Sequence, residues 1–314
     1  MNSSLTTFVI TVLFCNVFGN FGNFHIVYLT ATKPDLRSKS AFLQCIVSAC
    51  HSICLIFQIP NAVLYLNDIQ ITRRQCFFMI SPFLISLNFQ CIVMLMMLVD
   101  IAAMIIFPFR YRKLSNTTFL TTASIAPAAF TIYFYTIGFL AIDDEVLPFC
   151  TGPFAMHPTV NKIWLPSLLT VNTMIVVLYF FVFALLYHVG KKQTLQKECR
   201  RVSRRLKVIL FIYMVSWYLS IFGATFLALF FEGRVLDFLR VNMAFFMELC
   251  FLQSFYVIMW RSKEYRLAFF SLYPCFDMNY FSPESTSRVI ESNKQTTTNQ
   301  VFLPRNTVGP TIIR

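Results

Sequence analysis

The chain has 314 residues, of which 57% are hydrophobic, 17% aromatic and 13% charged. This composition excludes an ordinary soluble domain, because a single soluble core does not need several apolar runs that are each long enough to span a bilayer. The formal net charge of +12 does not predict a nucleic-acid partner, because the basic residues lie in loops between the apolar runs, as on the cytoplasmic side of a membrane protein.

In chain order, the apolar runs predict an all-α membrane protein with a bundle of seven transmembrane helices. The runs cover approximately residues 7–29, 41–66, 76–100, 118–142, 163–187, 208–231 and 238–260. Residues 1–6 form a short extracellular N-terminus, and residues 7–270 form the membrane domain with a short amphipathic helix after the seventh run. Residues 271–314 form a cytoplasmic tail, whose Ser, Thr, Asn and Pro content predicts disorder.

The distribution of lysine and arginine predicts an N-terminus outside the cell. Of the 26 such residues, the outer loops hold only Arg73, Arg74, Lys162, Arg234 and Arg240. Positive charge concentrates in short cytoplasmic loops, so the other segments lie inside. An outside N-terminus makes the glycosylation sequon at Asn2 usable, and a chance match of that sequon is an equal alternative.

Cys76 and Asp100 bracket the third apolar run. A helix between them rises about 36 Å, which crosses a hydrocarbon core of about 30 Å. Pro108 and Tyr111 follow within a basic cluster. These four residues resemble, in type and spacing, the third transmembrane helix and second intracellular loop of rhodopsin-like G-protein-coupled receptors. Ile101 stands where that family has an arginine.

The ten cysteines include no CxxC pair and no Cys/His metal spacing, so we expect no metal and no other cofactor. Only Cys76 and Cys150 fall in the predicted outer loops. The receptor resemblance implies a disulfide between them that pins the second outer loop over the third helix. Two free cysteines are the alternative.

Two further motifs narrow the resemblance. Gly22-Asn23 is followed by a Leu-Arg-Ser sequence that begins at Leu36, and an Arg-Ser-Lys-Glu-Tyr-Arg sequence begins at Arg261. Together they resemble the nematode chemosensory receptors called serpentine receptor class sx. The resemblance implies a plasma-membrane, multi-pass receptor of sensory cilia that detects small molecules and signals through a heterotrimeric G protein.

Polar residues inside the runs predict a buried network. Asn23 should face inward, because an amide that faces lipid is costly. His51 falls where the receptor family has a sodium-binding aspartate, and it is either a neutral core residue or a pH-sensitive switch. Glu248 lies within an apolar run. It either pairs with His51, contacts the ligand, or is protonated and hydrogen-bonded to a neighbour.

The receptor resemblance also implies a ligand cavity between the outer halves of the helices. The residues that fall there are mostly apolar: Phe83, Leu84, Leu87, Asn88, Trp217, Ser220, Ala224 and Glu248. This lining suits a small, weakly polar ligand. The third run carries no acid at this depth, which argues against an amine ligand.

The resemblance places G-protein contacts at the other end of the bundle. They comprise Asp100, Ile101, Pro108, Arg110 and Tyr111, together with Arg204 and Arg205 in the basic loop 191–207, which also suits anionic membrane lipid. Because Ile101 replaces an arginine, we expect weak or unusual coupling. Asp100 is then either hydrated or paired with Arg110 or Arg112.

Two other functions remain open. One is a non-signalling homologue that acts in homo- or hetero-oligomers. The other is a seven-span ligand-gated channel subunit, which the charge distribution opposes because such subunits have their N-terminus inside. An enzyme is not expected, because the sequence has no His-Glu-x-x-His, no Gly-x-Ser-x-Gly and no paired intramembrane aspartates.

Overall fold

The structure is a computed structural model. It describes residues 3–67, 69–147, 150–190, 208, 210–217, 219–220, 223, 226, 230–231 and 233–273; for 3–8, 65, 187–190 and 233–244 it describes the backbone alone. The chain divides into a large unit, Met1–Phe269, and a second unit, Phe270–Arg314. The large unit holds the elements that matter for function.

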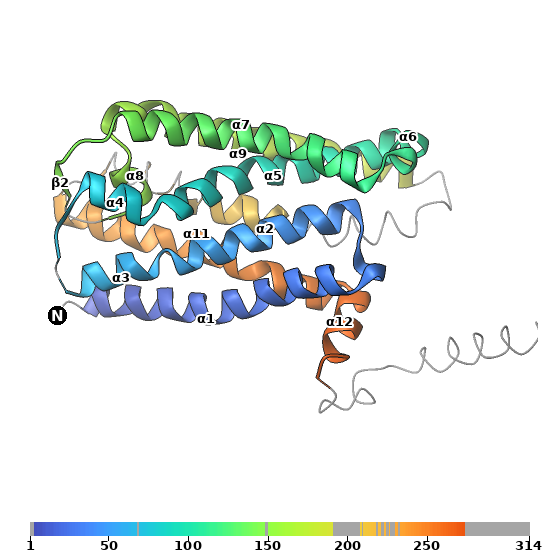
Figure 1. Cartoon of the computed structure of the whole chain (residues 1–314), viewed down its shortest axis with the longest axis horizontal. Coiled ribbons are helices and arrows are strands. Elements are labelled where there is room, and N and C mark those ends of the chain that lie inside the picture. Colours follow the sequence, from blue (N-terminus) through green and yellow to red (C-terminus); the bar gives the residue numbers. More distant parts are fainter. Residues whose placement is uncertain are drawn as a thin grey trace, which may run out of the picture. The chain divides into compact units, whose positions relative to one another are not determined.

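Long helices that lie side by side make up the large unit (Figure 1). They are α1 (Ser3–Thr32), α2 (Lys39–Ile56), α5 (Ser81–Ile106), α7 (Asn116–Leu140), α9 (Pro158–Gly190) and α11 (Gly233–Arg261). Among the described residues, five segments are long and apolar enough to cross a membrane: Val9–Thr32, Lys39–Leu64, Ser81–Ile106, Asn116–Leu140 and Pro158–Leu186. The sixth predicted run, 208–231, lies largely outside the described residues, and α11, which covers the seventh, is not among these five segments, so the count of seven spans remains a prediction.

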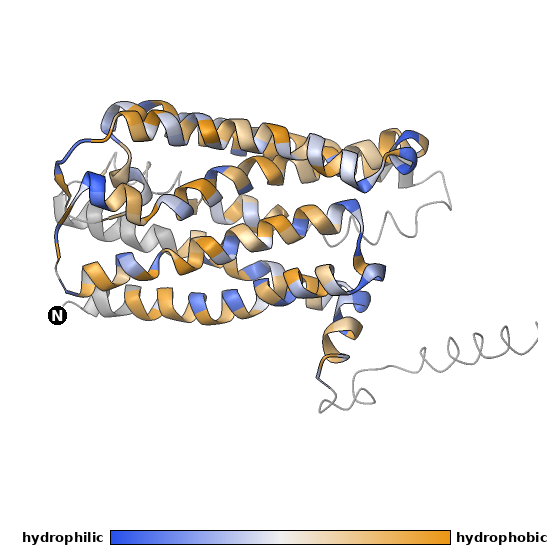
Figure 2. Ribbon diagram, viewed as in Figure 1, coloured by the Kyte–Doolittle hydropathy of each residue, from blue (hydrophilic) through white to orange (hydrophobic). Residues whose placement is uncertain are grey.

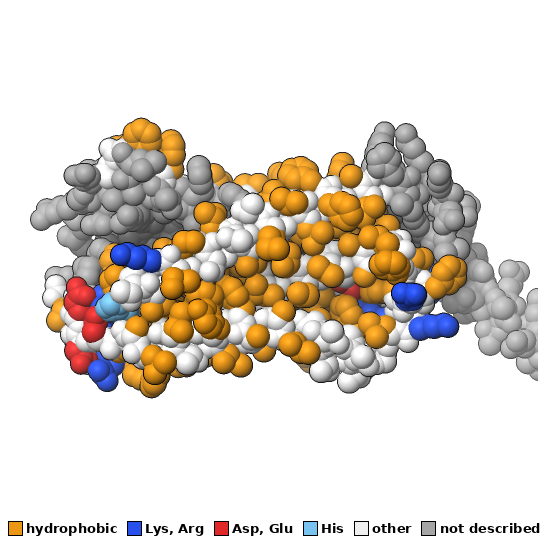
Figure 3. Space-filling view, turned by 90° about the horizontal axis from the view of Figure 1, so that it is seen from above, with side chains coloured by type: hydrophobic (Ala, Val, Ile, Leu, Met, Phe, Trp, Pro, Cys, Tyr) orange, Lys and Arg blue, Asp and Glu red, His pale blue; other side chains and the backbone are white. Residues whose placement is uncertain are grey.

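The side chains that these helices present outward are largely apolar. Figure 2 shows apolar residues along the length of the described helices, and Figure 3 shows one face on which charged side chains gather toward the two ends. Along α1, Phe14, Phe18, Phe21 and Phe24 are all exposed. An apolar surface of this extent suits lipid rather than water, and the backbone polar groups beneath it are satisfied within the helices.

Prolines set the breaks in two of the predicted spans. The second span is divided at Phe57, and α3 (Ile59–Leu66) then begins with Pro60 in its first turn. The third span consists of α4 (Arg73–Met79) and α5, which meet at Ile80 just before Pro82. Proline has no amide hydrogen and clashes with the preceding turn, so each helix restarts at the proline.

Short elements connect the long helices. They are η1 (Pro34–Leu36), β1 (Ile71–Thr72), α6 (Pro108–Lys113), β2 (Val146–Leu147), α8 (Gly152–Ala155) and α12 (Lys263–Phe270). β1 and β2 pair antiparallel with Ile71 opposite Leu147, which joins the first outer loop to the second. The hydroxyls of Thr30 and Tyr265 lie 3.1 Å apart, which fastens α12 to α1.

α1 and α11 pack closely because α1 carries glycine at the contact. A Cβ atom added to Gly22 would lie 2.5 Å from Cβ of Phe255. One residue further along, Asn23 is fully buried and donates a hydrogen bond to the Phe251 carbonyl over 3.0 Å. Small residues at a helix contact in a membrane allow this close approach.

α5 occupies the centre of the unit and packs against α2, α7 and α9. Its buried face includes Leu84, Cys91, Met94 and Met97, none of which exposes any measurable surface. The side chains that carry the functional argument lie at its two ends.

Candidate functional site

The outer end of α4 and α5 is covalently joined to the second outer loop. Cys76 and Cys150 form a disulfide with Cα atoms 5.4 Å apart, so the predicted disulfide is confirmed. Together with the β1–β2 pair, this bond holds the loop against the outer end of the third span.

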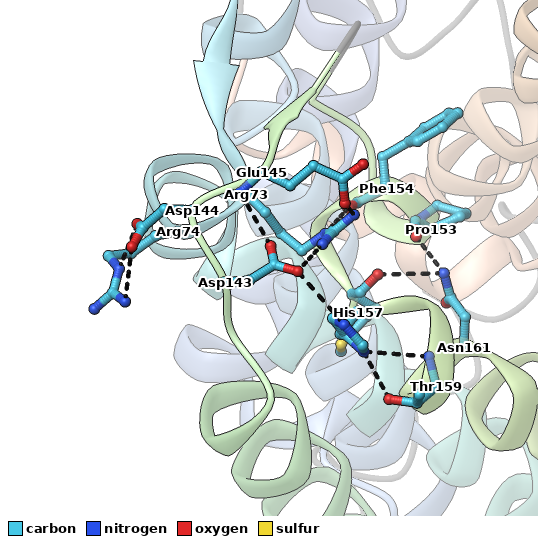
Figure 4. A network of polar contacts seen from close by, with 11 residues as sticks. Arg73, Arg74, Asp143, Asp144, Glu145, Pro153, Phe154, His157, Thr159 and Asn161 are labelled. Atoms are coloured by element: carbon cyan, nitrogen blue, oxygen red, sulfur yellow. Dashed lines mark hydrogen bonds and ion pairs between the residues drawn. The ribbon is translucent and has the colours of Figure 1, made fainter.

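The disulfide, the β1–β2 pair and the loop 143–155 that they hold form the outer cap. Arg73 adds ion pairs to this outer cap (Figure 4). Its guanidinium donates to Asp143, to Glu145 over 2.7 Å and to the Phe154 carbonyl over 3.2 Å. The Arg73 side chain is only 5% exposed, and the five donors of a guanidinium suit such a multiple contact. The neighbouring pair Arg74–Asp144 spans 2.8 Å and is well exposed.

The far end of the same loop is fixed at the start of α9. His157 Nδ1 accepts a hydrogen bond from the Thr159 amide over 3.3 Å, and His157 Nε2 lies 3.4 Å from Asp143. Asn161 donates to the carbonyls of Pro153 and Met156, which closes the turn around α8 (Figure 4). Both ends of the outer loop are therefore tied to helices.

Beneath this cap lie the predicted ligand residues of α5. Phe83, Leu84, Leu87 and Asn88 are all buried on α5. A Cβ added to Gly152 of α8 would lie 3.5 Å from the Phe83 ring and 3.6 Å from Trp164, so the loop contacts this layer directly. Asn88 Oδ1 accepts a hydrogen bond from Trp164 Nε1 over 2.8 Å.

The other predicted ligand residues lie on the α11 side or in the partly described sixth run. Trp217 and Ser220 are buried, and the Trp217 ring lies 5.7 Å from the ring of Tyr213. Ala224 lies outside the described residues. Glu248 is buried, and within the described residues one of its carboxyl oxygens has no hydrogen-bond partner.

His51 does not partner Glu248. Within the described part of the chain no ion pair joins these two residues, and the His51 ring instead lies 5.2 Å from the ring of Phe251. The suggested pairing of Glu248 with His51 is therefore not formed in the structure, where both ring nitrogens of His51 lack a hydrogen-bond partner among the described residues.

A second network lies at the inner end of α5. Asp100 is 1% exposed and accepts hydrogen bonds from the Tyr111 hydroxyl, over 2.7 Å, and from Ser40. Lys39 donates to the Tyr111 carbonyl, and its ammonium group lies 4.1 Å from the centre of the Tyr111 ring. One carboxylate thus links α2, α5 and α6.

Local sequence explains this arrangement. Ser38 caps α2 by accepting from the Ala41 amide, so Lys39 and Ser40 occupy the first turn of that helix. The positive end of the α2 dipole then faces the Asp100 carboxylate. Pro108 begins α6, and Tyr111 follows one turn later.

The expected partners of Asp100 are therefore corrected. Arg110 and Arg112 are exposed, and neither forms an ion pair with Asp100 in the described part of the chain. Ile101 is 1% exposed and belongs to the apolar core. Arg204, Arg205 and Asn2 lie outside the described residues.

The comparison with protein families decides the class. A family model described as serpentine type 7TM GPCR chemoreceptor Srsx matches residues 16–273. The chain belongs to this chemoreceptor family. A search of curated proteins finds no match. The match covers both ends of α5, so the outer cap and the Asp100 network are parts of a multi-pass membrane chemoreceptor.

In this Srsx receptor, sequence reasoning missed several residues that the structure brings together. Lys39 and Ser40 come from α2, Arg73 comes from α4, and Trp164 comes from α9. A charge signal was available for Arg73, because three consecutive acids begin at Asp143 in the loop opposite. No local signal identifies Lys39 or Ser40.

Proposed function

We propose that this Srsx receptor spans the membrane seven times, with its N-terminus outside, and signals through a heterotrimeric G protein. Its ligand is a small, weakly polar molecule that binds in the outer half of the bundle. The plasma membrane, in sensory cilia, is the proposed location. Membrane lipid surrounds the bundle, and homo- or hetero-oligomers are the further partners proposed.

The observation that carries this proposal is that the two ends of α5 have different surroundings. Its outer end holds buried ligand-site residues such as Leu87 and Asn88 beneath a disulfide-bonded loop. Its inner end holds Asp100 in contact with the second intracellular loop. A ligand that favours one arrangement of α5 over another would shift the population at the inner end, which is the general form of receptor activation.

One observation favours a second function. Ile101 is buried and apolar, so the residue after Asp100 offers no charge to a G protein. A homologue that binds ligand but acts through a partner receptor in a hetero-oligomer would show this feature. It remains a multi-pass receptor with the same orientation.

Two measurements test these functions together. An epitope placed after Phe269 should be detected only in permeabilised cells, whereas an N-terminal epitope should be detected on intact cells. Detection of the tail epitope on intact cells would favour the inverted channel topology. Ligand-dependent nucleotide exchange on a G protein, measured with the same tagged chain, separates a signalling receptor from a silent one.

A further inference from the structure

The hydrogen bond between Trp164 and Asn88 fixes the orientation of a buried amide. An indole nitrogen is only a donor, so the atom that accepts from Trp164 Nε1 at 2.8 Å must be the Asn88 oxygen. The Asn88 nitrogen then points to the other side of the amide. It is buried, and no described atom accepts a hydrogen bond from it.

Asn172 on α9 shows the complementary pattern. Its nitrogen donates to the Leu168 carbonyl over 2.8 Å, and a carbonyl is only an acceptor, so the orientation of this amide is also fixed. The Asn172 oxygen is buried, and within the described residues it receives no hydrogen bond. One asparagine therefore offers an open donor and the other an open acceptor.

The two amides lie on the same seam between α5 and α9. The Asn172 nitrogen lies 3.8 Å from Cys91 Sγ, and Cys91 follows Asn88 by one helical turn. Three residues of helix rise about 4.5 Å, so the two amides lie about one helical turn apart along this seam.

The surroundings of this seam are apolar. Within one helical turn of the two asparagines, α5 and α9 carry the buried core residues Leu84, Leu87, Leu168 and Val171. No charged side chain of the described chain forms an ion pair or a hydrogen bond with either asparagine. A charged ligand group would lose its hydration here without compensation, whereas a neutral polar group would satisfy both amides.

We propose that Asn88 and Asn172 form a subsite that recognises a hydroxyl group on an otherwise apolar ligand. The hydroxyl oxygen accepts from the Asn88 amide nitrogen, and the hydroxyl proton is donated to the Asn172 amide oxygen. This subsite rests on the proposed function as a receptor for small, weakly polar molecules, and it specifies which polar group that ligand carries. Ethers and ketones satisfy only Asn88, and alkanes satisfy neither residue.

The test is direct binding to the purified full-length receptor in lipid nanodiscs, without a G protein. The probes are straight-chain primary alcohols from butanol to decanol, each paired with a methyl ether of the same number of heavy atoms. Saturable stabilisation against thermal unfolding should be stronger for the alcohol than for its ether by about 3- to 10-fold in apparent affinity, the effect of one buried hydrogen bond.

Variants locate the effect. Asn172→Leu removes the acceptor at similar volume, and it should abolish the preference for alcohol over ether. Asn88→Ala should weaken binding of both probe classes. Asn20→Leu is the matched control, because Asn20 is a buried α1 asparagine whose nitrogen bonds to Asn16, and it should retain the preference.

Three outcomes would overturn the subsite: no saturable binding for any alcohol, equal binding of alcohols and ethers, or an alcohol preference that survives in Asn172→Leu. If Asn172→Leu does not fold, Asn172→Ser replaces it in the test. The shorter serine side chain withdraws the acceptor from the ligand hydroxyl, so the preference for alcohol over ether should decrease. A receptor that binds alcohols as expected but activates no G protein would refute the signalling proposal and leave the subsite intact.

Discussion

The Tyr111 hydroxyl donates a hydrogen bond to Asp100 Oδ1 at 2.7 Å and so fastens α6 to the C-terminal end of α5. Asp100 is 1% exposed, so its carboxylate depends on protein donors rather than on water. Ser40 supplies the donor for the other oxygen. Any change that removes one of these donors leaves a buried oxygen without its partner.

Replacing Tyr111 by phenylalanine should loosen the attachment of α6 to α5. The change removes one hydrogen bond to a charged group, worth about 1.5–3 kcal/mol, without altering the ring that packs against Lys39. We expect a lower unfolding temperature and a higher basal rate of nucleotide exchange on a coupled G protein. Tyr133→Phe, on the exposed face of α7, is the control. An unchanged basal rate would argue that α6 is not held by Asp100.

Lys39 and Asp100 should be energetically coupled. Lys39 holds the backbone of Tyr111, whose side chain binds Asp100, so the two residues act through one shared partner. A double-mutant cycle with Lys39→Met and Asp100→Asn should give a coupling free energy of about 1–3 kcal/mol. Thermal unfolding in detergent provides the four stabilities. Strict additivity would show that Lys39 contributes only its packing against the Tyr111 ring.

The adjacent arginines 73 and 74 should differ strongly in importance. Arg73 is buried and bonds two carboxylates and a carbonyl, so Arg73→Met should destabilise the outer cap by about 2 kcal/mol or more. Arg74→Met breaks an exposed pair and should change stability by less than about 1 kcal/mol. Limited proteolysis of the second outer loop on intact cells would report the difference. Equal protease sensitivity of the two variants would contradict it.

Two α1 glycines should respond differently to alanine. At Gly22 the new Cβ would lie 2.5 Å from Cβ of Phe255, which can move only if α11 moves. At Gly19 the nearest atom, at 2.4 Å, is the terminal Leu55 Cδ1, which can rotate away. We therefore expect Gly22→Ala to cost about 1–3 kcal/mol and Gly19→Ala clearly less, as measured by thermal unfolding. The reverse order would mean that α1 and α11 are less tightly packed.

Much of the helical layout could be predicted because apolar length is a local property. Each of the first five runs overlaps a helix that meets the requirements for a membrane span. The break at Ile80 was missed, since a proline two residues into a helix ends one element and starts another without interrupting the apolar run.

The partners of buried polar groups were much harder to predict. Asp100 bonds to Ser40, which is 60 positions away in sequence, and not to the arginines in the loop that follows it. Which residue bonds to Asp100 depends on how the first turn of α2 packs against α5. That packing is a tertiary contact and leaves no local signal in the sequence. Glu248 shows the same difficulty, because the pairing with His51 that its sequence position suggested does not form in the described part of the chain.

Because the helix is interrupted at Ile80, α5 can tilt about that residue as a rigid rod. On one side of the break, α4 is anchored by the Cys76–Cys150 bond, whereas the far end of α5 is held by hydrogen bonds around Asp100. Measured from Ile80, Asn88 lies about 12 Å along the helix and Asp100 about 30 Å. A tilt that displaces Asn88 by about 0.5 Å would move Asp100 by about 1.2 Å, which is enough to break its bond to Tyr111.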